Sequence, residues 1–98
     1  MSHLELTMGI DLGDRHSHLC LLGTESGEVI EQSRISTNPK AFEKRFRGCQ
    51  RMRVAIEAGT HSPWVSRLLE ECGHDVLLSP TLEEADADLR RGPQDRRA

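Results

Sequence analysis

Two carboxylates close short apolar runs in this chain of 98 residues: Asp11 follows the run that starts at Leu6, and Glu57 ends the run "RVAIE". If these runs are neighbouring parallel strands, about 4.8 Å apart, both side chains lie at one edge of the sheet. Adjacent carboxylates repel each other unless a cation lies between them. Mg²⁺ suits such a site, because it takes one or two carboxylates, keeps several waters and contacts phosphate oxygens. The pattern predicts Asp11 and Glu57 as ligands of Mg²⁺, or of Mn²⁺, in phosphodiester cleavage. The open alternative is that Asp11 caps a turn and Glu57 is a solvated strand end.

Polar residues flank both acids. Thr60 and His61 follow the second acid, and His61 could contact a phosphate or a metal-bound water, or be a polar residue at a helix start. Arg15 lies in the turn after the first acid, where it could approach a phosphate. Ser62 is interpreted as a helix N-cap rather than a nucleophile, because the sequence places no base beside it.

Three possible zinc ligands alternate along one run: His16, His18 and Cys20. They share one face of a predicted strand, but no fourth ligand is evident, so we interpret them as ordinary sheet residues. With Cys49 and Cys72 the chain has an odd number of widely spaced cysteines. This predicts reduced thiols in a cytoplasmic protein.

The segment 40–53 concentrates positive charge in a chain of net charge −3. It holds one acid, Glu43, and six basic residues: Lys40, Lys44, Arg45, Arg47, Arg51 and Arg53. Such a run is either a solvated face or a surface that contacts nucleic-acid phosphates. The sequence is compatible with both.

Alternating apolar residues and turn signals predict five strands. The first two form a hairpin around the turn 13–15, and the third follows a second turn at 25–27. The expected strands are Leu6 to Asp11, His16 to Leu22, Glu28 to Ser36, Arg53 to Glu57 and His74 to Leu78.

Two helices are expected after the third strand. The first begins at the cap Asn38 with proline in its first position, buries Phe42 and Phe46, and stops at Gly48. The second begins at 62–63 in the same manner. Its predicted apolar face carries Trp64, Leu68, Leu69 and Cys72, with Gly73 as the predicted C-cap.

The resulting order is βββαβαβ, with the fourth strand beside and parallel to the first. This is the ribonuclease-H-like plan, a mixed five-stranded sheet with helices packed on it; actin-like ATPase domains begin in the same way. We expect one domain over residues 1–80 and a polar, loosely attached tail over 81–98. No apolar run approaches the length of a membrane span.

Four stretches carry a resemblance to a known family. They are "MGIDLGDRHSHLCLL", "ESGEVIEQSRIST", "VAIEAGTHSPWVSRLLEECGHDV" and the closing "SP". Together they resemble the N-terminal DEDD domain of transposases of the insertion-sequence one-ten family, over about residues 6–80. The most specific part is "EAGTHSPWVSRLL", in which a strand-end Glu precedes a Trp-containing helix.

The resemblance implies a nuclease fold like that of Holliday-junction resolvases, in which four acids bind magnesium ions that cut and rejoin DNA. Asp11 matches the first acid of the family and Glu57 the second. The third and fourth form an Asp-x-x-Asp pair that this sequence lacks, since Asp86 and Asp88 have the wrong spacing and Asp95 stands alone. The resemblance also implies a separate C-terminal domain with a nucleophilic serine, and a guide RNA as a partner of family members. This sequence shows no such domain, so we expect a truncated copy that is inactive alone.

Three functions stay open at this stage. The first is a DNA-processing domain for magnesium-dependent strand cleavage and transfer, with the 40–53 segment holding DNA. The second is a non-catalytic remnant that binds nucleic acid or pairs with transposase subunits as a homo-oligomer. The third is an actin-like phosphate-binding lobe, which the acidic turn residue Asp14 disfavours.

Overall fold

Seven elements follow one another in the computed structural model, which describes residues 4–79. Their order, βββαβαβ, is the predicted one. The strands are β1 (Leu6–Leu12), β2 (His16–Gly23), β3 (Val29–Ser36), β4 (Arg53–Glu57) and β5 (Asp75–Ser79), and the helices are α1 (Pro39–Phe46) and α2 (Ser62–Glu71).

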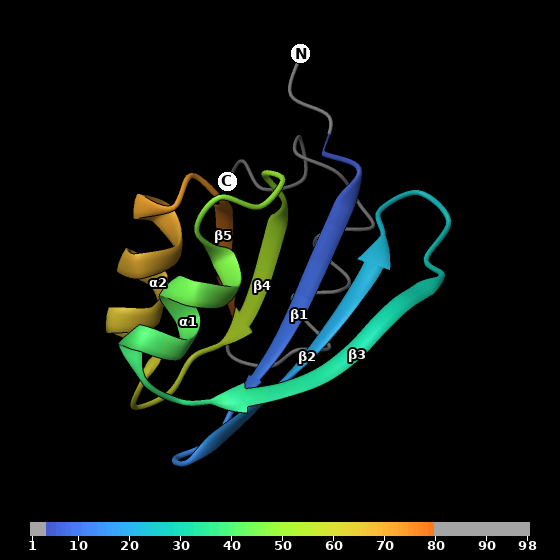
Figure 1. Cartoon of the computed structure of the whole chain (residues 1–98). Helices are drawn as coiled ribbons and strands as arrows, with labels where there is room; N and C mark the ends of the chain where they lie inside the picture. Colours follow the sequence, from blue (N-terminus) through green and yellow to red (C-terminus); the bar gives the residue numbers. More distant parts are fainter. Residues whose placement is uncertain (1–3, 80–98) are drawn as a thin grey trace.

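The five strands form one mixed sheet in the order β3-β2-β1-β4-β5 (Figure 1). β1 to β3 form an antiparallel meander, and β4 lies parallel to both β1 and β5. The predicted fold class is therefore confirmed: the chain has an α/β, ribonuclease-H-like sheet with helices packed on it. The carboxyl ends of β1 and β4 lie at the same end of this sheet (Figure 1).

Both helices cover the same face of the sheet. Every second residue of the central strands points to that face, where Met8, Ile10, Val54 and Ile56 are fully buried. The helices contribute the rest of one apolar cluster, which includes Phe42, Phe46, Val65 and Leu69. We call the opposite side, which neither α1 nor α2 covers, the bare face.

The start of α1 is the one predicted. The side chain of Asn38 accepts a hydrogen bond of 2.8 Å from the backbone N–H of Ala41, and proline occupies the first helical position. Phe42 and Phe46, one turn apart, have no exposed surface and stack with ring centroids 5.9 Å apart. Gly48, just past the end, adopts φ +82°, a value that favours glycine.

The predicted cap of α2 is wrong. His61 is the N-cap residue and makes no side-chain capping bond, whereas Ser62 is already inside the helix. The Ser62 hydroxyl instead closes the preceding turn: it donates to the Gly59 carbonyl at 2.8 Å and accepts from the Gly59 N–H at 3.1 Å. The Ser62 hydroxyl therefore bonds within the turn that precedes α2 instead of capping the helix.

His74 joins three segments inside the core. Its Nδ1 accepts from the Met52 N–H at 3.2 Å, so the ring proton is on Nε2, which donates to the Phe46 carbonyl at 2.9 Å. The residue is only 5 % exposed. The predicted fifth strand began here, but β5 starts one residue later because the His74 backbone belongs to the turn after α2.

Residue 80, the predicted domain end, and the predicted tail 81–98 lie outside the described residues. Cys20, Cys49 and Cys72 are free thiols. Within residues 4–79, no helix is long and apolar enough to cross a membrane.

Candidate metal and nucleic-acid site

Asp11 and Glu57 occupy matching positions on adjacent parallel strands. The last register pair between β1 and β4 joins Ile10 to Ile56, and each acid is the next residue along its strand. Because Ile10 and Ile56 are buried under the helices, the alternation of the strands directs both acids to the bare face. The two carboxylates thus share a face and an end of the sheet.

Each acid lines a different depression. Asp11 lines an open hollow of about 630 Å³, together with Gly9, His18, Leu19, Cys20, Gln32, Ser33 and Arg34. Glu57 lines a smaller pocket of about 120 Å³, together with Leu12, Asp14, Ala58, Gly59, Thr60 and His61. The predicted candidates Thr60 and His61 therefore lie beside Glu57, as their place in the sequence indicated.

The described residues offer a metal ion few ligands. Among residues 4–79, no group of three or more His, Cys, Asp or Glu side chains is arranged to hold a metal. Two carboxylates suit one Mg²⁺ ion that keeps most of its water, since this ion is often bound through only one or two carboxylates. The predicted pair therefore has the ligand type and number that one hydrated Mg²⁺ ion takes.

His61 connects the pocket of Glu57 to the β1–β2 hairpin. Its Nδ1 accepts from the Trp64 indole N–H at 3.2 Å, so Nε2 carries the ring proton and faces the Asp14 carboxylate at 3.3 Å. Both ring nitrogens are occupied, which leaves no free lone pair for a general base in this arrangement. His61 can hold Asp14, whose side chain is 94 % exposed, at the rim of the pocket.

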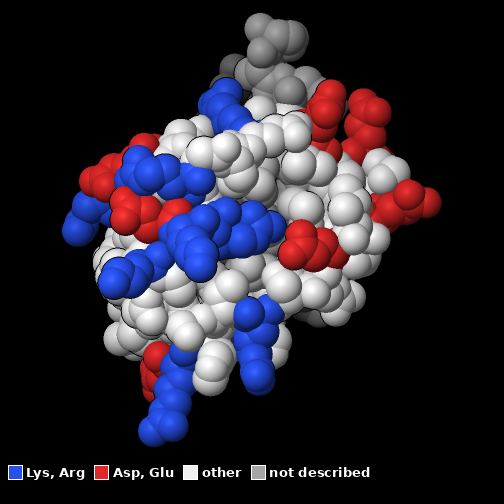
Figure 2. Space-filling model, viewed as in Figure 1, with Lys and Arg blue, Asp and Glu red and all other residues white. Residues whose placement is uncertain are grey.

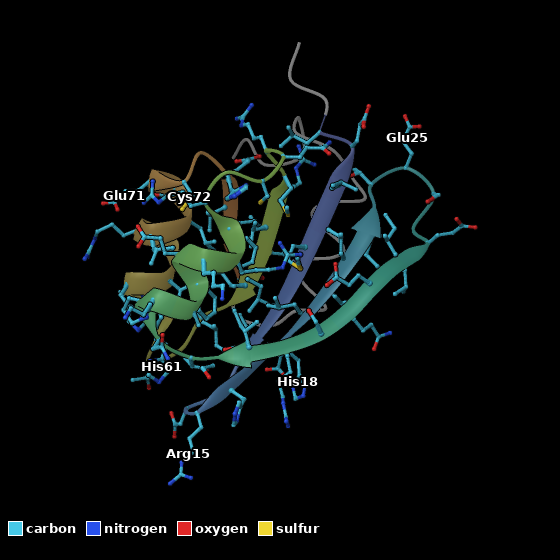
Figure 3. The ribbon with its side chains drawn as sticks, viewed as in Figure 1. Arg15, His18, Glu25, His61, Glu71 and Cys72 are labelled. Atoms are coloured by element: carbon cyan, nitrogen blue, oxygen red, sulfur yellow. The ribbon has the colours of Figure 1, made fainter. Side chains whose placement is uncertain are left out.

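Three labelled side chains mark the same end of the molecule. Figure 3 shows Arg15 at the tip of the β1–β2 hairpin, with His18 and His61 nearer the body of the sheet. Arg15 is exposed and has no acidic partner within residues 4–79. It can therefore approach a phosphate brought to this end of the sheet.

The six basic residues of 40–53 do not form one uniform surface. Arg45 lies 3.6 Å from Glu31, and Arg47 lies 2.7 Å from Glu43. The hydrogen bond that Arg47 donates to the Glu43 carboxylate is the main reason why the pKa of Arg47 is raised above its ordinary value. Figure 2 shows the same mixture, with acidic side chains among the lysines and arginines over the α1 region.

The other basic residues of the segment 40–53 also lie on different parts of the molecule. Arg51 donates to the Gly73 carbonyl at 3.1 Å, and Arg53 lies 3.6 Å from Asp75. Since Val54 belongs to the core, alternation places Arg53 on the bare face rather than beside α1. Only Lys40 and Lys44 of the six have no bonded partner in the 4–79 part of the chain.

The thiol of Cys72 is not activated as a nucleophile. Burial is the main cause that raises the pKa of the Cys72 thiol, so this sulfur is a protonated thiol at neutral pH. Cys72 also lies at the end of the molecule opposite His61 (Figure 3). Cys20 shares the bare face with His16 and His18, but these three do not meet as a metal cluster within the described residues.

Two residues of this region had no role in the sequence prediction. Asp14 was interpreted as a turn residue, and only the folded hairpin brings it to His61, 47 positions away. Arg34 was part of a predicted strand, and the register of β2 with β3 sets it directly beside His18. A signal for Arg34 was present, since it is the only basic residue of the third strand.

The chain was compared with protein-family models, curated proteins and solved structures, and a solved structure of T. thermophilus RuvC is among the matches. No protein-family model matches the chain, and no curated protein matches it. The chain is similar to T. thermophilus RuvC, solved in complex with a Holliday junction substrate, with a TM-score of 0.48 and 17 % sequence identity. The similarity covers 78 % of this chain and 64 % of that one, so the chain spans less than two thirds of the RuvC chain.

Proposed function

We propose that this chain is a DEDD-type nuclease domain of the insertion-sequence one-ten transposase kind, which binds a divalent metal through Asp11 and Glu57 and binds DNA beside it. Its biological context would be DNA transposition in the cytoplasm. We choose this family because four stretches of the sequence resemble its N-terminal domain, and the topology of the sheet agrees with this choice. The RuvC structure contains a DNA junction, which is in keeping with a DNA partner.

One observation carries the metal proposal: Asp11 and Glu57 are each one residue beyond the buried pair Ile10 and Ile56. The core therefore holds the two strand ends in register, and the acids cannot leave the bare face without exposing isoleucine. Mg²⁺ bound here would polarise a phosphate oxygen and supply an activated water. The chain's own contribution is to hold two carboxylates on one rigid sheet.

Cleavage by two metal ions needs more ligands than this pair. A family member completes its site with a second acid pair, and none of the described residues forms such a group with Asp11 and Glu57. We therefore assign metal and DNA binding to this chain. Strand cleavage and transfer would require further acids, from transposase subunits or from outside residues 4–79, and guide RNA would belong to that larger assembly.

The lack of a larger ligand group also favours a second candidate function, a non-catalytic domain that binds nucleic acid or pairs with transposase subunits. The two candidates differ in the metal dependence of DNA binding. On the full chain, Mn²⁺ should strengthen binding of labelled supercoiled and junction DNA in the first case, through Asp11 and Glu57, and leave it unchanged in the second; nicking would show that residues outside 4–79 supply the further acids. Nicking that persists in Asp11→Asn would contradict the assigned ligands.

The metal assignment is tested by isothermal titration with Mn²⁺ on the full chain. We expect Asp11→Asn and Glu57→Gln each to weaken Mn²⁺ binding at least about tenfold, since mutation even of a residue that only hydrogen-bonds to a metal ligand lowers metal affinity by this much. Glu43→Gln is the matched control, because it removes an acid from the helix side of the sheet. Equal affinities in all four proteins would refute the proposal.

A further inference from the structure

A line of polar residues crosses the bare face at the level of the two acids. Strand register pairs Asp11 with His18 and His18 with Arg34, so these three side chains follow one another over β1, β2 and β3. On the other side of Asp11 the line continues with Glu57, which pairs with Ser79 of β5. The half of the line on β2 and β3, with His18 and Arg34, is cationic or neutral. The half on β1 and β4, with Asp11 and Glu57, is acidic.

We propose that His18 and Arg34 bind a backbone phosphate of single-stranded nucleic acid, one nucleotide or two away from the phosphate at the acids. The strand would then cross the sheet from β3 toward β4. This inference deepens the proposed function and rests on it for the position of the reacting phosphate. Arg34 lies two strand spacings from Asp11, about 10 Å.

The hollow beside Asp11 has room for a nucleotide. Its volume, about 630 Å³, is within the range of about 300–1,000 Å³ typical of small-molecule sites, and Arg34, Gln32 and His18 line it. Gly9 forms part of its wall without a side chain. A Cβ on Gly9 would meet only the Cys20 carbonyl oxygen, at 4.0 Å, so backbone crowding does not require glycine there and its effect is to leave space.

Arg34 is the available cation on this face. It is exposed, and no acidic partner engages it within residues 4–79. Glu31, the acid of the same strand, points to the opposite, helix side of the sheet, where it lies 3.6 Å from Arg45. Arg53, also on the bare face, is already paired with Asp75. A guanidinium free of carboxylates can present two N–H groups to one phosphate, which is the geometry that arginine binds best.

We expect the bare face to contact the phosphate backbone of a nucleic acid rather than its bases. The chain's three aromatic residues, Phe42, Phe46 and Trp64, all belong to the helix side, where Trp64 packs edge-on against Phe42 at 5.5 Å. Single-stranded nucleic acid is usually held by stacking of bases on aromatic rings as well as by charge. Without such rings, binding here depends on phosphate contacts, which carry no sequence information.

Fluorescence anisotropy of a labelled 20-nucleotide single-stranded DNA tests the inference on the full chain, in EDTA, over 50–200 mM NaCl. We expect Arg34→Gln to raise Kd about three- to tenfold, as loss of one charge-assisted contact does, and to reduce the slope of log K against log salt by about 0.7. The same losses should be seen with oligo-dT and with mixed sequence. Lys44→Gln, which removes a cation from α1, should change neither quantity as much.

The outcomes separate this inference from the metal assignment. Because EDTA removes metal, the loss in Arg34→Gln is measured whether or not Asp11 and Glu57 bind an ion. The inference is overturned if the wild type does not bind the DNA, or if Arg34→Gln keeps the wild-type Kd and salt slope. It is also overturned if Lys44→Gln carries the larger loss, since the phosphates then follow the helix side. Unchanged circular-dichroism melting of Arg34→Gln excludes a folding defect.

Discussion

The two faces of the sheet are built from the same strands and have opposite chemistry. On the helix side, Ile10 and Ile56 are completely buried in the apolar cluster that also contains Phe42 and Phe46 of α1. On the bare face, the next residues along, Asp11 and Glu57, border depressions whose linings include further polar side chains such as Arg34 and His61. A shift of one residue in either strand would exchange the two sets. Apolar packing on one side of the sheet therefore positions the charged groups on the other side.

The sharpest test of this comparison substitutes neighbouring residues on opposite faces. Ile56→Ala should lower the free energy of unfolding by about 2–5 kcal/mol, because it leaves a cavity in the core. Glu57→Ala should change it by only about 0.5 kcal/mol. Urea unfolding followed by circular dichroism measures both. If Glu57→Ala costs as much as Ile56→Ala, the bare face is packed in the protein and the comparison fails.

A smaller effect is expected from the two histidines that differ in face. His74→Ala removes the partners of the Met52 N–H and the Phe46 carbonyl, both inside the core, and should cost about 2–3 kcal/mol. His18→Ala, on the bare face, should cost less than about 0.5 kcal/mol. His74→Asn, which retains an acceptor for the Met52 N–H, should fall between them. Equal losses in the two alanine variants would show that His18 also has a packing role.

The smallest of the three effects concerns the start of α1. Asn38→Ala removes the acceptor for the Ala41 N–H and should destabilise the protein by about 1 kcal/mol. Asn38→Ser keeps a capping oxygen and should lie close to the wild type. Ser36→Ala, two residues earlier on the exposed strand end, is the matched surface control and should have almost no effect on the urea midpoint. A loss in Ser36→Ala equal to that in Asn38→Ala would remove capping as the cause.

Most of the fold was predictable, for reasons visible in particular residues. The alternation in β1 and β4, the cap at Asn38 and the spacing of Phe42 and Phe46 are local signals, and each has its predicted result. The N-cap of α2 was not predictable in the same way. Ser62 has the right residue type, but its hydroxyl bonds to Gly59 in the preceding turn, and a pattern of residue types does not rank these two uses.

The site was predictable in part. Asp11 and Glu57 were chosen because each ends an apolar run, and the register between β1 and β4 sets them on one face. Their role as metal ligands stays a prediction. The basic segment was treated as one surface, whereas Arg53 belongs to the bare face and Arg45 and Arg47 are engaged with acids on the helix side. Pairing with distant acids cannot be inferred from a run of like charges.

The sequence by itself determined where each strand and helix forms and which residues of a strand share a face, because backbone geometry repeats every two residues in a strand and every 3.6 in a helix. Only the tertiary structure decided which distant residues meet. Asp14 reaches His61, and Arg34 comes into line with His18 and Asp11, through the order and register of the strands. That order follows from burying the apolar faces of all seven elements together, a condition on the whole chain that no local pattern contains.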